Sequence, residues 1–276
     1  MRNLSEANLT EAAIARLARC EDPRFKQIMT SLIRHLHAFV REVEITEAEW
    51  FEAIQFLTAT GQKCDGDRQE FILLSDVLGV SMLVDAINHR SPDGATESTV
   101  LGPFYIEGAP DLPAGADIAH GSPGEATEVS GRVLSVAGKP IAGAVLDVWQ
   151  TAANGFYSTQ DPNQDRFNLR GRFRTDAEGK YRFRTIKPVS YPVPTDGPVG
   201  RILNAMGRHP HRPAHIHFIV SAPGYERVAT HLFANGDPYL DSDVVFGVKN
   251  SLVVDFKPKA NGPLLEVTYD FGLKPN

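Results

Sequence analysis

The chain has 276 residues, of which 42% are hydrophobic and 22% are charged, and its formal net charge at pH 7 is −6. This composition is typical of a globular protein with one large domain or two smaller ones, and the scattered Lys and Arg residues argue against nucleic-acid binding. The sequence has no apolar run long enough for membrane insertion and no apolar leader, so we expect a cytoplasmic protein.

The first ninety residues are predicted to be helical. Asp22 and Pro23 form an N-cap followed by a first-turn proline, and apolar residues then recur at spacings of three and four. Thr46 and Glu49 have the spacing of a capping box ahead of a second helix. Residues 68–87 carry the apolar stripe of one further long helix, and the pattern ends at residues 89–99.

After an irregular, Gly- and Pro-rich connection over residues 100–126, the hydrophobic period changes to two. Two successive hairpins are predicted, one across the turn at 137–143 and one across the turn at 176–179, with further strands at 215–220, 229–233, 251–256 and 265–271. Short strands without intervening helices favour an antiparallel β-sandwich. The predicted fold is therefore α+β, with a helical domain at 1–96 and a β-sandwich domain at 97–276.

Residues 208–218 contain four of the nine histidines of the chain. His215 and His217 are two positions apart in a predicted strand, so both side chains point to one face and could bind one metal ion. The same pattern also occurs as ordinary strand surface. His209 and His211 lie in a Pro-flanked loop, where we expect no role as ligands, and the nearest carboxylates have no distinguishing context.

Two tyrosines lie upstream in turn-rich segments: Tyr157 in "WQTAANGFYSTQD" and Tyr191 in "RTIKPVSYPVPTDGPVG". Taken singly, each could be a loop anchor. Together with the histidine segment and "VLGPFY" at residues 100–105, however, these segments resemble the intradiol ring-cleavage dioxygenases in order and spacing. The resemblance extends from the N-terminal helices to the last strand.

That resemblance implies a catalytic sandwich domain in which Tyr157, Tyr191, His215 and His217 bind one mononuclear Fe(III) per subunit. A phenol has a pKa near 10, so two tyrosines become phenolates at neutral pH only when a strongly Lewis-acidic cation binds them. The resemblance further implies that an aromatic diol or triol and O2 are the substrates. It also implies that Tyr191 leaves the metal as the substrate chelates, and that Arg212 stabilises charge on the reacting ring.

Within the family, the chain resembles most closely the members that cleave hydroxyquinol, partly because His231 stands where catechol-cleaving members tend to carry glutamine. The residues that the resemblance places at the substrate are Leu73, Asp76, Val100, Leu101, Gly102, Pro103, Phe104, Val193, Pro194, His231 and Val245. Asp76 and His231 are the polar candidates for contact with a third hydroxyl group. Cleavage of catechol or chlorocatechol remains the alternative activity.

The stripes on the N-terminal helices are wide enough to pack against a neighbour as well as the core. The resemblance implies a homodimer joined through these helices, and it allows a lipid at that interface, although no residue requires one. A remote alternative is a non-catalytic, transthyretin-like binding sandwich, which "GRVLSVAGKPIAGAVLDVWQ" at residues 131–150 also resembles.

Overall fold

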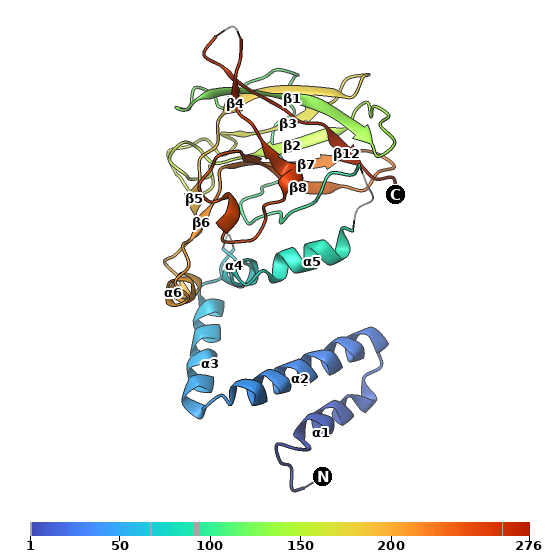
Figure 1. Ribbon diagram of the computed structural model, residues 1–276, viewed down its shortest axis with the longest axis vertical. Coiled ribbons are helices and arrows are strands. Elements are labelled where there is room, and N and C mark those ends of the chain that lie inside the picture. The colour runs from blue at the N-terminus through green and yellow to red at the C-terminus, as the bar shows by residue number, and fades with distance from the viewer. Residues whose placement is uncertain (1, 67, 91–93, 261) are drawn as a thin grey trace. The chain divides into compact units, whose positions relative to one another are not determined.

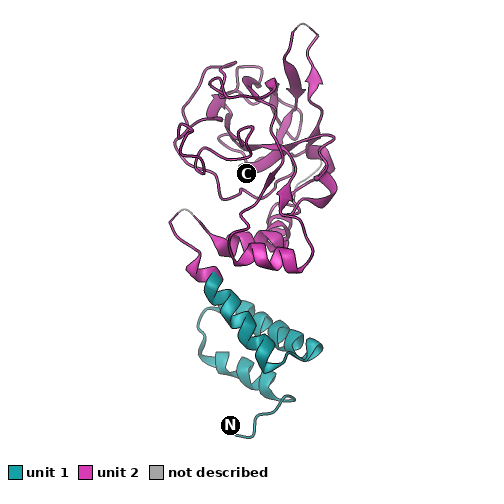
Figure 2. Cartoon of the chain, turned by 90° about the vertical axis from the view of Figure 1, so that its left-hand side faces the viewer, with its two compact units in different colours: residues 1–59 teal, residues 60–276 magenta. Residues whose placement is uncertain are grey.

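The computed structural model describes residues 2–66, 68–90, 94–260 and 262–276. The chain divides into two units, residues 1–59 and residues 60–276, shown in teal and magenta in Figure 2. This division lies within the third helix of the chain. The boundary between a helical domain and a sandwich domain, which we expect between residues 96 and 97, stays a prediction.

The first unit consists of helices with the predicted caps. It contains α1 (Leu9–Ala15), the short 3-10 helix η1 (Arg16–Arg19), α2 (Pro23–Val43) and most of α3 (Glu47–Gln62). The Asp22 carboxylate accepts hydrogen bonds from the backbone N–H groups of Arg24, at 2.8 Å, and Phe25, at 3.1 Å. Thr46 and Glu49 form the capping box, with the Thr46 N–H 2.9 Å from the Glu49 carboxylate. Both local predictions are confirmed.

Helices α2 and α3 carry rows of large apolar side chains that are exposed on the single chain. On α2 these are Phe25, Ile28, Leu32, Leu36, Phe39, Val40 and Val43, and on α3 they are Trp50, Phe51, Ile54 and Leu57. Exposed apolar surface of this extent is typical of an interaction site.

The long helix predicted over residues 68–87 is interrupted in the structure. It forms α4 (Glu70–Val77) and α5 (Val80–Asn88), separated at Gly79, whose φ is +74°. A left-handed backbone at this position suits glycine, and a β-carbon here would lie 3.4 Å from the Phe246 ring. The single-helix prediction was wrong because an apolar stripe does not reveal a tertiary contact at a glycine.

Two five-stranded sheets form the sandwich of the second unit (Figure 1). One has the order β10-β11-β1-β12 with β4 also on β1, and the other has the order β3-β2-β7-β8-β9. The bounds are β1 Ala126–Ser135, β2 Val145–Trp149, β3 Arg170–Arg174, β4 Lys180–Ile186, β7 His215–Ser221, β8 Val228–Ala234, β9 Val253–Val254, β10 Lys257–Pro258, β11 Leu265–Thr268 and β12 Phe271–Leu273. Fully buried side chains of both sheets, such as Val129 and Phe218, share one core.

The predicted fold class, α+β with a β-sandwich, is confirmed, but the sheets are mixed. Strand β1 pairs antiparallel with β4 and parallel with β11 and β12, and β8 pairs parallel with β9. The remaining pairs of the two sheets, β2 with β3 and β7, β7 with β8, and β10 with β11, are antiparallel.

In neither of the two predicted hairpins do the two strands pair with each other. The turns are present at both places, but the first connects β1 to β2 and the second connects β3 to β4, and in each case the two strands belong to different sheets. Both connections are crossovers from one layer of the sandwich to the other. The prediction was wrong because alternation shows which side chains of a strand are buried, and a short turn fits either connection.

Shorter elements complete the second unit: β5 (Tyr191–Pro192), α6 (Pro198–Ala205), β6 (His211–Arg212), and the 3-10 turns η2 (Leu240–Ser242) and η3 (Asn250–Leu252). Strands β5 and β6 pair so that Tyr191 lies opposite Arg212. Residues 100–125 form the irregular connection that was predicted, with turns and isolated bridges. Among the described helices, none combines the length and apolarity needed to cross a membrane.

Candidate metal centre and active site

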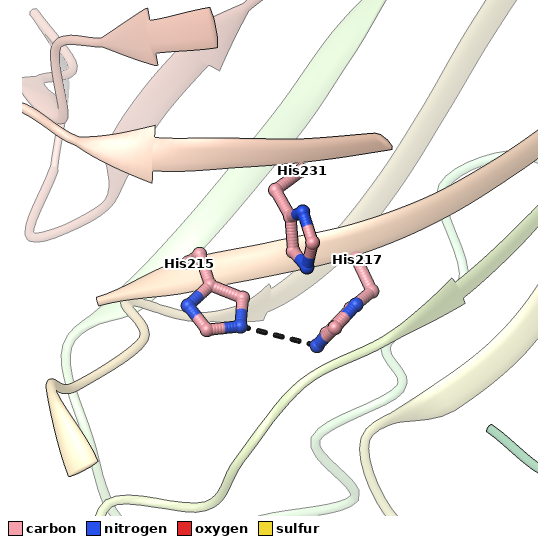
Figure 3. Close-up of side chains that lie close together, drawn as sticks. All are labelled: His215, His217 and His231. Atoms are coloured by element: carbon pink, nitrogen blue, oxygen red, sulfur yellow. Dashed lines mark hydrogen bonds between the residues drawn. The ribbon is translucent and has the colours of Figure 1, made fainter. Parts of the chain in front are cut away.

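Three buried histidines from two neighbouring strands point toward one another (Figure 3). His215 and His217 share one face of β7, as predicted, and their Nε2 atoms are 3.1 Å apart. His231 lies opposite His217 in the pairing of β7 with β8. One ring nitrogen from each histidine falls within 4.8 Å of the others, which is close enough for all three to surround a metal ion.

The two tyrosines reach the same point from outside these strands. Tyr157 comes from the loop after β2 and Tyr191 from β5, and both side chains are buried. The Tyr157 hydroxyl lies 3.1 Å from the Tyr191 hydroxyl and 2.9 Å from Nε2 of His217. The structure therefore brings together the four donor atoms of Tyr157, Tyr191, His215 and His217.

Burial sets the protonation of these groups when no cation is present. It raises the pKa of Tyr157 and of Tyr191, and it lowers the pKa of His215 and of His217. The imidazoles are therefore neutral, which is their metal-binding form. The phenols are protonated unless a cation stabilises the phenolate, so the site matches a hard, highly charged metal ion.

The hydrogen bonds around the histidines leave nitrogen atoms directed at the cluster. The Pro213 carbonyl lies 2.6 Å from Nδ1 of His215, which orients that ring so that Nε2 faces His217. Nδ1 of His231 contacts the Thr99 hydroxyl. Among the described residues, Nε2 of His231 and Nδ1 of His217 have no hydrogen-bond partner although both atoms are buried. The orphaned Nε2 of His231 beside four converging donors indicates a ligand-binding site.

Arg212 lies at the edge of the cluster. It is 3% exposed, and its Nη1 is 3.3 Å from Nε2 of His215. Its Nε and Nη2 lie 3.2 and 3.3 Å from the two carboxylate oxygens of Asp243. Burial opposes the charge on Arg212, but Asp243 and the tyrosine oxygens outweigh burial and raise its pKa.

Asp243 is a site residue that the sequence reasoning missed. Its carboxylate also accepts hydrogen bonds from the backbone N–H groups of Val245, at 3.3 Å, and Gly247, at 3.0 Å. A β-carbon at Gly247 would lie 3.1 Å from both Arg212 Nη2 and Asp243 Oδ2, so a larger residue there would press on the ion pair. No sequence pattern around residue 243 signals this role.

The residues predicted to form the substrate pocket do not all line the same cavity. Five of them line a cavity of about 700 Å³ within the second unit: Asp76, Val100, Leu101, Gly102 and Pro103. The cavity also touches Thr99, which contacts His231. A β-carbon on Gly102 would lie 3.2 Å from the His217 ring, so this wall of the cavity reaches the histidine cluster.

The other pocket candidates are not among the residues that line this cavity. Phe104 stacks on Tyr157 with ring centroids 4.5 Å apart. Leu73, Val193 and Val245 are buried in one apolar cluster that also contacts Val100. Pro194 follows Val193 and is half-buried. These positions are compatible with a substrate pocket.

Asp76 is buried, and burial raises its pKa, whereas Ser81 and Arg212 act in the opposite direction. His209 and His211, which were not expected to be ligands, lie outside the cluster. The His211 ring stacks on Tyr239, with centroids 4.5 Å apart, and Nε2 of His209 is 2.8 Å from the Ser242 hydroxyl.

Two further residues that lie next to rings of the site were not predicted from the sequence. Trp149 stacks on the His217 ring, with centroids 4.6 Å apart, and Arg170 lies over the Tyr157 ring. Both are buried at the paired ends of β2 and β3. The only signal in the sequence is the residue type, because a large or charged side chain is unusual in a strand that has the pattern of a buried strand.

Comparisons with known proteins cover nearly the whole chain. Residues 100–275 match the family described as Dioxygenase, and residues 22–96 match the family described as Catechol dioxygenase N terminus. The chain is 54% identical to 6-chlorohydroxyquinol 1,2-dioxygenase of Cupriavidus pinatubonensis, covering 100% of this chain and 99% of that protein. It is 53% identical to hydroxyquinol 1,2-dioxygenase of a Rhizobium species, covering 97% of this chain and 95% of that protein.

A solved structure of hydroxyquinol 1,2-dioxygenase from Pseudomonas putida is 56% identical to this chain and superposes with a TM-score of 0.94. The superposition covers 98% of this chain and 99% of the other. Catechol 1,2-dioxygenase of Pseudomonas arvilla superposes with a TM-score of 0.82 at 32% identity, covering 98% of this chain and 91% of that one.

Proposed function

This chain belongs to the intradiol ring-cleavage dioxygenase family, and from that premise we propose that it cleaves hydroxyquinol, benzene-1,2,4-triol, between its 1- and 2-hydroxyl carbons. Both atoms of O2 enter the product, which is 3-hydroxy-cis,cis-muconate, the enol form of maleylacetate. The observation that carries the proposal is the meeting of two tyrosine oxygens and two histidine nitrogens in a buried cluster beside a cavity. Family membership favours an enzyme over the transthyretin-like alternative.

We propose that Tyr157, Tyr191, His215 and His217 hold one Fe(III) per subunit. The donor set supports this choice, because phenolate oxygens are hard anionic ligands and two of them balance most of the charge of a ferric ion. The orphaned Nε2 of His231 is available to a bound molecule rather than needed as a fifth protein ligand. When bound, Fe(III) supplies Lewis-acid activation of the chelated aromatic ring toward O2.

The residues around the donors account for proton and charge handling. We propose that Tyr191 is the ligand that would give way to the substrate: its phenolate oxygen would accept one of the two hydroxyl protons, and a hydroxide ion would accept the other to form water. Arg212 lies beside His215 at the edge of the cluster, and Asp243 fixes its charge. That position suits stabilisation of negative charge that develops on the ring oxygens during attack by O2.

The third hydroxyl of hydroxyquinol needs a polar partner, because a buried hydroxyl without one costs about 1–3 kcal/mol. We propose Asp76 or His231 for this contact. Asp76 lines the cavity, and Nε2 of His231 has no other partner among the described residues. The apolar walls, which we assign to Leu73, Val193, Pro194, Val245 and residues 100–104, would pack on the two faces of the ring.

We also propose a cytoplasmic homodimer joined through the N-terminal helices. The exposed apolar rows on α2 and α3 support this assembly, since they are large for a surface that faces only water. A lipid at the same interface is compatible with this surface, and no described residue requires one.

The decisive experiment combines iron analysis with oxygen uptake on hydroxyquinol, 6-chlorohydroxyquinol, catechol and 4-chlorocatechol. We expect a red to brown protein with one iron per subunit that uses hydroxyquinol at least about tenfold more efficiently than catechol, which corresponds to about 1.4 kcal/mol. Equal efficiency on catechol would favour the catechol-type alternative. An active protein that is colourless and free of iron would contradict the metal assignment.

A further inference from the structure

Two buried arginines lie beside the two tyrosines of the site, and their surroundings differ. Arg212 lies opposite Tyr191 in the β5–β6 pairing and forms an ion pair with Asp243 at 3.2 Å. Arg170, the first residue of β3, has its guanidinium carbon 5.9 Å from the centre of the Tyr157 ring. Within the described ranges, no carboxylate forms an ion pair with Arg170.

Arg170 is nevertheless held in place firmly. It is 1% exposed, and its Nε donates a 2.8 Å hydrogen bond to the hydroxyl of Ser158, the residue that follows Tyr157. That hydroxyl in turn donates a 2.8 Å bond to the Arg166 carbonyl, so the guanidinium is anchored to the loop that carries Tyr157. Nη2 of Arg170 is buried and has no hydrogen-bond partner in the part of the chain that the structure describes.

A buried cation without an anion destabilises a protein strongly. Burial lowers the pKa of Arg170 to about 10, which still leaves the side chain charged at neutral pH, and the Tyr157 oxygen and, more weakly, the Asp147 carboxylate act in the opposite direction. The missing negative charge can therefore come from Tyr157 itself once that tyrosine is a phenolate. Asp243 already serves this purpose for Arg212.

We propose that Arg170 is a positioning residue that acts as a counter-charge of the Tyr157 phenolate and thereby weakens electron donation from Tyr157 to the bound metal. This role rests on the proposed function, because it requires Tyr157 to be an anionic ligand of Fe(III). Arg212, the arginine opposite Tyr191, differs from Arg170 because it forms an ion pair with Asp243. The two tyrosines of the site are thus electronically different ligands.

The direction of the effect follows from Coulomb's law. A positive charge over the Tyr157 ring stabilises the electrons that the phenolate shares with the metal, and the colour of such a site arises when those electrons are excited toward Fe(III). Removal of the charge raises the energy of the donor electrons and narrows the energy gap between the phenolate and Fe(III) orbitals. The tyrosinate-to-iron absorption band should therefore move to longer wavelength.

The test compares iron-loaded wild type with Arg170→Gln, Arg170→Met and Arg170→Lys. Arg172→Gln is the matched control, because Arg172 lies two positions along the same strand and is partly exposed, next to Asp111. We expect the Gln and Met variants to absorb at longer wavelength, the Lys variant to remain close to wild type, and the control to match it. Either neutral variant suffices if the other fails to fold.

Denaturant unfolding of the metal-free and iron-loaded proteins gives an independent measurement. Iron should stabilise Arg170→Met less than it stabilises wild type, because the variant lacks the charge that the phenolate balances. The role of Arg170, but not the ligand assignment, would be overturned by either of two results. One is an equal loss of unfolding free energy in the metal-free and iron-loaded variant, and the other is an unchanged wavelength of the absorption band in the iron-loaded variants. A wild-type protein that binds iron without any such band would instead overturn Tyr157 as a ligand, and the role of Arg170 with it.

Discussion

The ion pair between Arg212 and Asp243 can be tested by removing each partner singly and both together. The two side chains are 4% and 1% exposed, so neither charge can be compensated by solvent. Asp243→Asn keeps the shape of the side chain and removes its charge, while Arg212→Met removes the cation and fills a similar volume. Each single variant leaves one buried charge without its partner, whereas the double variant leaves neither.

The size of the effect follows from the hydrogen bonds. The Asp243 carboxylate accepts bonds from Nε and Nη2 of Arg212 and from the backbone N–H groups of Val245 and Gly247. Asparagine offers one oxygen in place of two, so two donors lose their acceptor, at about 1–3 kcal/mol each. This agrees with the loss of about 3–5 kcal/mol typical of breaking a buried pair from one side. The double variant should lose less than the sum of the single variants, by about 3 kcal/mol.

Urea unfolding of the four proteins measures this coupling, and Asp241→Asn, at an exposed carboxylate two residues away, is the control with an unchanged free energy of unfolding. Turnover should fall in Arg212→Met by about 2–4 kcal/mol in activation free energy, with a smaller change in the half-saturation concentration. Additive losses in stability would refute the paired arrangement. Normal turnover with weakened substrate binding would return Arg212 to a binding role.

Three further outcomes test the site. Tyr157→Phe and Tyr191→Phe should each weaken the colour of the iron-loaded protein and the double variant should abolish it, so a double variant with the wild-type visible spectrum would refute both ligands. His231→Gln should lower the preference for hydroxyquinol over catechol by about tenfold if His231 contacts the third hydroxyl, and Asp76→Asn should do so if Asp76 does; an oxygen electrode shows which variant changes, and no change in either would exclude both. Gly102→Ala should bind iron more weakly, since its β-carbon would lie 3.2 Å from His217 at a φ of +78°, and an unchanged iron titration would contradict that contact.

The local features of the fold were predictable because their causes are local. The Asp22 cap and the Thr46–Glu49 capping box depend on groups within three residues of each other, and the sequence alone specifies them. The break at Gly79 was missed although its signal is also local, because glycine is common directly after the C-cap of a helix. The apolar stripe continues through the break, so periodicity gave no warning.

The strands were found but their partners were not. Alternation in β1 and β2 shows that one face of each strand is buried, and it contains no information on which strand lies alongside. In the structure, β1 pairs with strands that lie up to the end of the chain, while β2 pairs with β3 and β7. A short turn between two alternating strands is therefore evidence for the strands and weak evidence for a hairpin.

The candidate site divides in the same way. His215 and His217 were predictable from a period of two, whereas Tyr157 and Tyr191 lie 34 positions apart in irregular segments and required a family resemblance. The charged residues next to these ligands follow no sequence pattern. Asp243 forms an ion pair with Arg212 across 31 positions, and no carboxylate among the described residues forms an ion pair with Arg170. Because donor types can be recognised in sequence motifs while the charges around them come from distant residues, the motifs predict the ligands that we propose, and the packing around them gives the two tyrosines different surroundings.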